Sequence, residues 1–373
     1  MCIRDRSRAE RAGFPFEETL ALLNMAEVAA EHRDLERAGE LSQQARDAAA
    51  SYEIRINEDA ASAHYAKVLD WRGDWTAAED TATEVVGTPY ATARSSQVAH
   101  AAGLDPVAEP PGHVLFYSQL VAGQVLGTLQ ARQGRPEALS TLTGIWRRAD
   151  AGDEMQILLP SAAGLAEYQW LKGEHDPALT ARFGEVLNDT RRLTFPWSAG
   201  WLAYWLWTLG ELSDAPKGIA EPYRLVIEGR PTEAATIWET KGIPYERGLA
   251  LMHGDEKDRL EALEVFETLG ATAVAAKLRR ALRAEGASVP RGRGRETRRH
   301  AAGLTARQAE VLQLLVAGLS NTEIADRLFV SPRTVETHVS AVLTKLGSST
   351  RKEAVVRARA EGLISVTDGH SRT

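Results

Sequence analysis

Apolar residues and alanines recur at positions i, i+3, i+4 and i+7 from Glu17 to Glu285. This spacing is typical of amphipathic helices, because it places the small and apolar side chains on one helix face. Alternating apolar and polar residues, which would indicate strands, are nearly absent from the same stretch. The pattern therefore restricts most of the chain to an all-α fold of consecutive helices.

Short polar turns divide these helices into pairs. Four of the turns carry a glycine, at Gly73, Gly134, Gly173 and Gly229. A small residue follows each of them in the second helix: Ala78, Ala138, Ala178 and Ala234. Glycine supplies the left-handed cap that ends a helix, and alanine would let the paired helices approach closely. We expect a solenoid of helical hairpins that resembles a tetratricopeptide (TPR-like) array with an irregular period, and a weaker turn at Arg33.

Proline and glycine mark the breaks in this array. Prolines interrupt the helices at residues 103–113 and 214–218, because a proline cannot continue a helix. Two further helices, at 259–269 and 272–284, would close the solenoid. Five arginines then alternate with glycine within residues 291–299, which indicates a flexible linker whose arginines are either solvated or lie along phosphates.

These breaks predict five segments. They are an N-terminal segment outside the fold (1–16), the solenoid (17–286), a basic Gly/Arg linker (287–302), a small C-terminal domain (303–366) and a tail (367–373). Residues 1–8 resemble a leader that recurs on open reading frames from metagenome assemblies, and we expect the natural start to lie elsewhere.

Several classes of protein are disfavoured by composition. No stretch reaches the roughly 18 apolar residues that a membrane span needs, and the N-terminus lacks the apolar core of a signal peptide, so we expect a cytoplasmic protein. The single cysteine, Cys2, cannot form an internal disulfide, and the nine histidines lack the spacing of metal sites. We expect neither a metal nor a cofactor.

The charge of the chain is uneven. Residues 288–373 hold 14 basic and 8 acidic residues, a net charge of +6, whereas the remainder holds 30 basic and 43 acidic residues, a net charge of −13. A local excess of Lys and Arg is typical of a domain that binds a polyanion, although a solvated surface would also carry it.

The C-terminal domain contains three helix starts in close succession. Thr305 precedes Gln308 by three residues and Ser320 precedes Glu323 by three, which is the spacing of a capping box. Ser331 then precedes a proline at the first position of a third helix. We expect that helix to run from 332 to about 346.

The third helix has two different faces at 100° per residue. One face is apolar and is expected in the core: Val335, Val339, Val342 and Leu346. The other is polar and has little bulk: Arg333, Glu336, Thr337, Ser340 and Thr344. A short helix, a tight turn and a helix with such a face are what insertion into a DNA major groove requires.

Four motifs in this domain carry a family resemblance. They are Leu304-Thr305-x-Arg307-x-x-Glu310-Val311-Leu312, Gly318-Leu319-Ser320-Asn321-x-Glu323-Ile324-Ala325, Leu328-x-Val330-Ser331-Pro332-Arg333-Thr334-Val335-x-x-His338-Val339 and Leu343-x-Lys345-Leu346-Gly347. Together they resemble the four-helix LuxR-type helix-turn-helix domain. Residues 245–280 also resemble the end of the helical region in large ATP-dependent, MalT-like regulators of that family.

The resemblance implies a bacterial transcription regulator that binds double-stranded DNA as a homodimer, with RNA polymerase as a further candidate partner. Carried over by position, the residues facing bases would be Glu336, Thr337 and Ser340. Those near the DNA backbone would be Arg333, Thr334, His338, Lys345 and Arg351. Dimer contacts would fall on Val355, Val356 and Arg359. Glu336 either selects sequence or faces solvent, because an acid opposes nonspecific binding to a polyanion.

Other interpretations remain open. The last domain could be a four-helix cap on the solenoid or a sigma-factor-like helix pair. The chain could also be a TPR-like scaffold that binds a protein or small-molecule effector, with DNA binding secondary. An aromatic stripe at helical spacing would then receive the effector, or would belong to the core: Trp197, Trp201, Tyr204 and Trp205. The phosphate-binding loop of the ATP-dependent relatives does not occur here, so we expect no enzyme activity.

Overall fold

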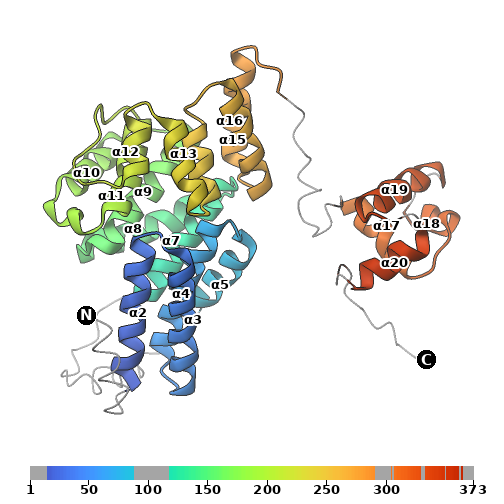
Figure 1. Ribbon diagram of the computed structural model, residues 1–373, viewed down its shortest axis with the longest axis horizontal. Coiled ribbons are helices and arrows are strands. Elements are labelled where there is room, and N and C mark those ends of the chain that lie inside the picture. The colour runs from blue at the N-terminus through green and yellow to red at the C-terminus, as the bar shows by residue number, and fades with distance from the viewer. Residues whose placement is uncertain are drawn as a thin grey trace. The chain divides into compact units, whose positions relative to one another are not determined.

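The computed structural model describes residues 15–87, 117–289, 304, 306–328, 332–348, 350–360 and 363. Within these ranges every regular element is a helix and no strand occurs, so the predicted all-α class is confirmed (Figure 1). The chain separates into two compact units, Met1–Val289 and Pro290–Thr373.

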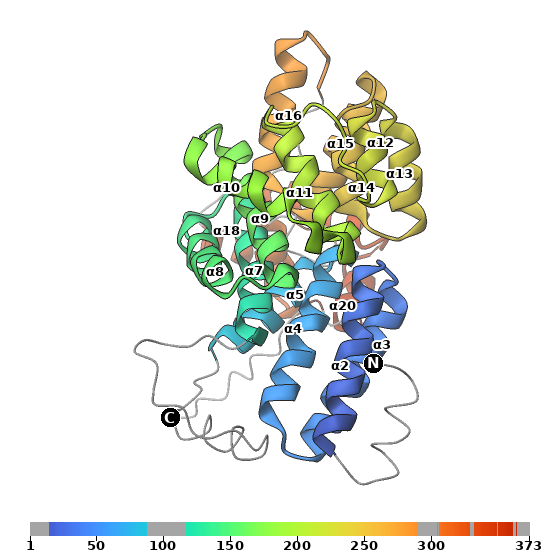
Figure 2. The same cartoon turned by 90° about the vertical axis from the view of Figure 1, so that its left-hand side faces the viewer.

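The first unit is a succession of helices, most of which pack against the next helix in the chain. They are α2 (Pro15–Glu31), α3 (Leu35–Ser51), α4 (Arg55–Arg72), α5 (Trp75–Gly87), α7 (Tyr117–Arg132), α8 (Ala138–Gly152), α9 (Met155–Lys172), α10 (Pro177–Asn188), the 3-10 helix η1 (Thr190–Thr194), α11 (Pro196–Thr208), α12 (Glu221–Ile227), α13 (Pro231–Thr240), α14 (Pro244–Leu251), α15 (Glu256–Leu269) and α16 (Thr272–Ala284). Figure 2 shows α2, α3 and α4 lying side by side. The packing of successive helices against one another agrees with the predicted helical hairpins. Their arrangement into a regular superhelix stays a prediction.

The predicted turns are confirmed in their backbone conformation. The four turn glycines have φ between 68° and 87°, and Arg33 has φ 55°, all in the left-handed region. Gly73 is needed for a second reason, since a Cβ atom there would lie 2.6 Å from Cδ2 of Leu269. The loop at 214–218 is not helical, whereas the loop at 103–113 lies outside the described residues.

One expectation about the paired helices is wrong. Ala78, Ala138 and Ala234 are fully buried, but Ala178 is exposed. It lies in the first turn of α10, whose inward positions are occupied instead by residues such as Phe183. Helix α2 begins at Pro15, two residues before the predicted start of the solenoid, where the missing N–H of a proline costs no helical hydrogen bond.

A continuous apolar core runs through the unit, from Ala30 in α2 to Leu282 in α16. One buried ionic cluster interrupts it, centred on Arg132, whose side chain is only 2% exposed. The Nε and Nη2 atoms of Arg132 donate to the Glu167 carboxylate at 2.9 and 3.2 Å, and Nη1 donates to Asp70 at 3.1 Å. The Tyr245 hydroxyl donates to Glu167 at 2.5 Å. These four residues join α7, α9, α4 and α14.

Glu246 lies beside this cluster and is 4% exposed. Burial raises the pKa of Glu246 to about 7, although the positive charge of Arg132 opposes the rise. Burial likewise raises the pKa of Asp70 to about 6 against the charge of Arg132. The cluster therefore contains more carboxylates than Arg132 alone neutralises, and protonation relieves the excess.

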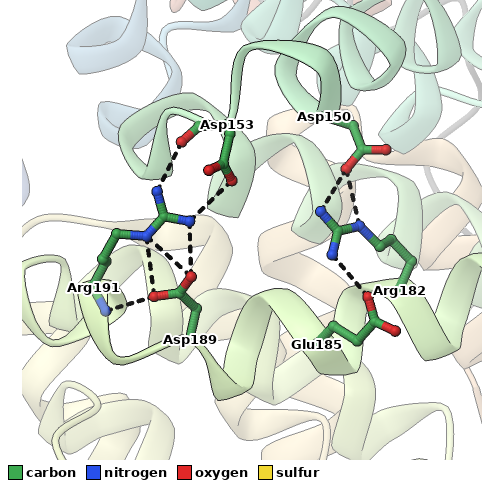
Figure 3. A network of polar contacts seen from close by, with 6 residues as sticks. All are labelled: Asp150, Asp153, Arg182, Glu185, Asp189 and Arg191. Atoms are coloured by element: carbon green, nitrogen blue, oxygen red, sulfur yellow. Dashed lines mark hydrogen bonds and ion pairs between the residues drawn. The ribbon is translucent and has the colours of Figure 1, made fainter.

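An exposed ionic network ties α8 to the elements after it (Figure 3). Its members are Asp150, Asp153, Arg182, Glu185, Asp189 and Arg191. Arg191 bridges Asp189 at 2.8 Å and Asp153 at 2.9 Å, while Arg182 reaches Asp150 at 3.0 Å. Exposed ion pairs add little free energy each, so this network chiefly orients the end of α8 toward α10 and η1.

Four helices occur in the described residues of the second unit: α17 (Ala306–Val316), α18 (Asn321–Leu328), α19 (Pro332–Lys345) and α20 (Arg351–Ala360). Two small apolar clusters hold them together. One includes Leu312, Val342 and Ala358, and the other includes Val311 and Val335. Both clusters contain residues of α17 and α19, so these two helices share most of the core.

We predict that Glu246→Gln removes a pH-dependent loss of stability in the first unit. The folded pKa is raised from 4.5 to about 7, so folding favours the protonated acid. Wild-type stability should fall as pH rises through that interval, by up to about 3 kcal/mol at 1.36 kcal/mol per pKa unit. Urea unfolding of the full chain at pH 5, 6, 7 and 8 measures this, since all nine tryptophans lie in the first unit.

The control for this prediction is Glu264→Gln, which removes an exposed carboxylate of α15. The difference in unfolding free energy between Glu246→Gln and wild type should grow toward pH 8, while that of the control should stay level. Equal pH slopes for wild type and Glu246→Gln would show that Glu246 does not titrate in this way.

Candidate nucleic-acid interface

The turn before α18 is fixed by a reciprocal capping box, as predicted. The backbone N–H of Ser320 donates to Oε2 of Glu323 at 2.7 Å, and the backbone N–H of Glu323 donates to Oγ of Ser320 at 3.3 Å. The Ser320 hydroxyl also donates to Oε2 of Glu323 at 2.7 Å, and this hydrogen bond, followed by that from the Ser320 N–H, lowers the pKa of Glu323. Gly318, with φ 86°, ends α17 just before this turn. The other two predicted caps, Thr305 and Ser331, lie outside the described residues.

The two predicted faces of α19 are found where its side chains are described. Val335 and Val342 are fully buried, Leu346 just beyond the helix is 4% exposed, and Val339 is partly buried against the same core. Glu336, Ser340 and Thr344 are exposed. The Thr344 hydroxyl turns back to donate to the Ser340 carbonyl at 3.0 Å. The outward face therefore presents one carboxylate and short hydroxyl side chains.

Not every residue predicted to face DNA can be placed. The side chains of Arg333, Thr334 and Thr337 lie outside the described part of the structure, although the three positions belong to α19. His338 is half-buried. The structure thus brings Glu336 and Ser340 together on one exposed face.

Lys345 and Arg351 have intramolecular partners that sequence reasoning missed. Nζ of Lys345 donates to Oε1 of Gln308 at 2.8 Å, linking the end of α19 to α17. The guanidinium of Arg351 donates to the Leu319 carbonyl and, at 3.4 Å, to Oδ1 of Asn321. Both cations therefore also hold the domain together. The buried amide of Gln308 was the available signal, because a polar group at an inward position needs a hydrogen-bond partner.

The residues predicted for dimer contacts separate on α20. Val356 is 67% exposed, and Arg359 is exposed as well. Val355 instead packs, partly buried, against the cluster that contains Val335. An exposed valine on a helix otherwise rich in charge is the feature of α20 that suits a contact with a second chain.

The aromatic stripe belongs largely to the core of the first unit. Tyr204 and Trp205 are 1% and 0% exposed, and Trp197 and Trp201 are partly buried against the same core. Trp205 also packs against Trp170, with ring centroids 5.3 Å apart. The structure therefore favours the core interpretation over an effector site at these four residues.

Two kinds of structural feature are absent from the described ranges. None of the helices there is both long enough and apolar enough to cross a bilayer. The same ranges contain no cluster of three His, Cys, Asp or Glu side chains arranged to hold a metal ion.

Comparison with known proteins identifies the second unit. Residues 302–358 match the luxR family of bacterial regulatory proteins. Relatives include an HTH-type transcriptional regulator of Mycobacterium bovis (49% identical over 75 residues), the transcriptional regulatory protein YxjL of Bacillus subtilis (47% over 60) and the transcriptional regulatory protein DegU of Brevibacillus brevis (43% over 63).

These matches are local. They cover 19%, 16% and 17% of this chain and 8%, 28% and 27% of the three relatives, respectively, so the chain spans well under a third of the curated relatives it matches. No solved structure matches the chain significantly. The four helices, their capping and the family match agree over the same residues. The C-terminal part of this chain is therefore a DNA-binding helix-turn-helix domain of the LuxR family.

Proposed function

We propose that the chain is a sequence-specific transcription regulator that places α19 in the major groove of double-stranded DNA. The observation that carries this proposal is the exposed polar face of α19 within residues that match a family of regulatory proteins. A recognition helix needs a buried face to hold it and an outer face small enough for a groove about 12 Å wide. Val335 and Val342 form the buried face, and Glu336 and Ser340 lie on the outer face.

The proposed base contacts are Glu336, Thr337 and Ser340. A carboxylate can accept a hydrogen bond from the N4 amino group of cytosine, and a hydroxyl can donate or accept at either base of a pair. Because Glu336 also repels phosphate, its removal should weaken discrimination and strengthen nonspecific binding. Weaker sequence discrimination together with stronger nonspecific binding would distinguish base recognition by Glu336 from a general electrostatic effect on DNA binding.

The proposed backbone contacts are Arg333, Thr334, His338, Lys345 and Arg351. Arg351 keeps further N–H donors besides its two intramolecular contacts, since a guanidinium carries five. Lys345 has three N–H donors, one of which it gives to Gln308, and its side chain remains exposed at the end of α19. Lys345 would therefore hold α19 to α17, and Arg351 would hold α20 to the start of α18, while each cation also contacts phosphate.

We further propose that the protein binds DNA as a homodimer through α20, with Val356 and Arg359 at the contact and Val355 supporting it from inside. A two-fold dimer would read two half-sites about one helical turn apart. The first unit would control this binding in response to a small molecule or protein, and RNA polymerase would be the downstream partner. The resemblance to MalT-like regulators supports that division of roles. The family match does not favour a scaffold whose DNA binding is secondary, and the relatives' names describe regulators.

We predict that Glu336→Gln changes the preferred DNA sequence. Selection from random duplexes should return a different base at one position of each half-site, with a change in discrimination of about 1–3 kcal/mol. Affinity for unrelated duplexes should rise, because a negative charge is removed from the interface. Glu353→Gln removes the same charge from the exposed side of α20 and should leave the selected sequence unchanged. Identical selected sequences for Glu336→Gln and wild type would disprove base reading by Glu336.

We predict a different result for Lys345→Gln. This change should weaken binding to all duplexes alike and reduce the slope of log affinity against log salt by about one unit. Gln308→Leu removes one intramolecular hydrogen-bond partner of Lys345 but keeps the charge of the lysine, so the salt slope of this variant should remain that of wild type. If Lys345→Gln keeps the wild-type slope, Lys345 acts only within the domain and does not contact phosphate.

A further inference from the structure

A cavity of about 340 Å³ lies among the last helices of the first unit. Its apolar wall is formed by the Trp170 ring at the end of α9, by Met252 after α14, and by Leu278 of α16. This volume is at the small end of the range for ligand sites, about 300–1,000 Å³. The cavity has room for a small molecule with an apolar body.

The polar part of the wall is basic. Lys277, Arg259 and His253 line the cavity, and no Asp or Glu lines it. The guanidinium of Arg259 is already paired, because its two Nη atoms lie 2.6 and 2.8 Å from the carboxylate oxygens of Glu285. Nζ of Lys277 lies 4.8 Å from the centroid of the Trp170 ring, and no ion pair to Lys277 forms in the part of the chain described. Lys277 is thus the positive charge in this wall that lacks a carboxylate.

Lys241, which also lies beside a tryptophan, provides a comparison for Lys277. Nζ of Lys241 also lies 4.8 Å from a tryptophan centroid, that of Trp197, but it donates a hydrogen bond to the His32 carbonyl at 3.3 Å. Lys277 has the same aromatic neighbour type without such an acceptor among the described residues. Burial and the nearby charge of Arg280 lower the pKa of Lys277, and an anion placed beside it would offset both effects.

His253 adds hydrogen-bonding capacity without charge. Its Nε2 lies 2.9 Å from the Tyr204 hydroxyl, and burial lowers its pKa to about 4. The imidazole is therefore neutral at pH 7 and offers one donor and one acceptor in total. One unpaired ammonium and a mainly apolar wall match a ligand with a single negative charge.

We propose that this cavity binds a small monocarboxylate with an apolar body. The carboxylate would pair with Lys277, and the body would pack against Trp170, Met252 and Leu278. Such a ligand would bridge α9 and α16, so it would stabilise the folded first unit by mass action. Its binding stands independently of DNA recognition, whereas any effect on DNA affinity rests on the function proposed above.

The experiment uses the full chain and two probes of equal shape, 3-phenylpropionate and its neutral amide. Isothermal titration calorimetry should show saturable binding of the carboxylate at one site per chain, with the amide at least tenfold weaker. Lys277→Met should weaken carboxylate binding tenfold or more, and Lys277→Arg should retain it. Lys241→Met is the matched control and should bind the probe as wild type does.

Circular dichroism and thermal unfolding establish that each variant is folded, and Lys277→Gln serves as a second variant if Lys277→Met is not. Absence of saturable carboxylate binding to wild type, equal affinity of carboxylate and amide, or undiminished affinity in a folded Lys277 variant would overturn the proposal. Failure of the chain to bind DNA both with and without the carboxylate would instead count against the proposed function and leave these titrations unaffected.

Discussion

The packing of the first unit depends on the buried ion pairs that the guanidinium of Arg132 forms. This guanidinium is buried together with Glu167 and Asp70, and Tyr245 adds a hydrogen bond to Glu167. A buried ion that loses its partner costs several kcal/mol, so the helices that carry these residues can pack only in the register that brings the charges together. Apolar contacts alone would permit sliding of one alanine-rich helix along another. The ionic cluster does not.

This constraint was not visible in the sequence. Periodicity and glycine turns are local signals, and they located the turns at Gly73 and Gly134 and the two faces of α19 correctly. The pairing of Arg132 with Asp70 joins residues 62 positions apart, and no local rule specifies such a partner. The charged residues within otherwise apolar helix stripes were the available signal. A charged residue at such a position needs a polar partner when it is buried, but the local sequence does not specify which partner.

In the candidate site, too, local features could be predicted from the sequence, whereas contacts between distant residues could not. Capping at Ser320 and burial of Val335 follow from short-range chemistry and were predicted. The contact between Lys345 and Gln308 depends on how α19 crosses α17. Both valines of α20 were predicted to make dimer contacts, but only Val356 is largely exposed. Ala178 was misplaced for a related reason, because helix phase at a first turn depends on the cap that precedes it. Tertiary packing therefore decided the details that a sequence pattern left open.

The central claim is that the outer face of α19 meets the bases of DNA. The most direct test replaces Cys2 by Ser and introduces one cysteine, either by Ser340→Cys on that face or by Gln313→Cys on the exposed side of α17. Each variant is labelled with a short photoactivatable cross-linker and bound to a duplex selected by wild type. Our account predicts a cross-link to a base from position 340 and none from position 313. Cross-linking from 313 with none from 340 would contradict it.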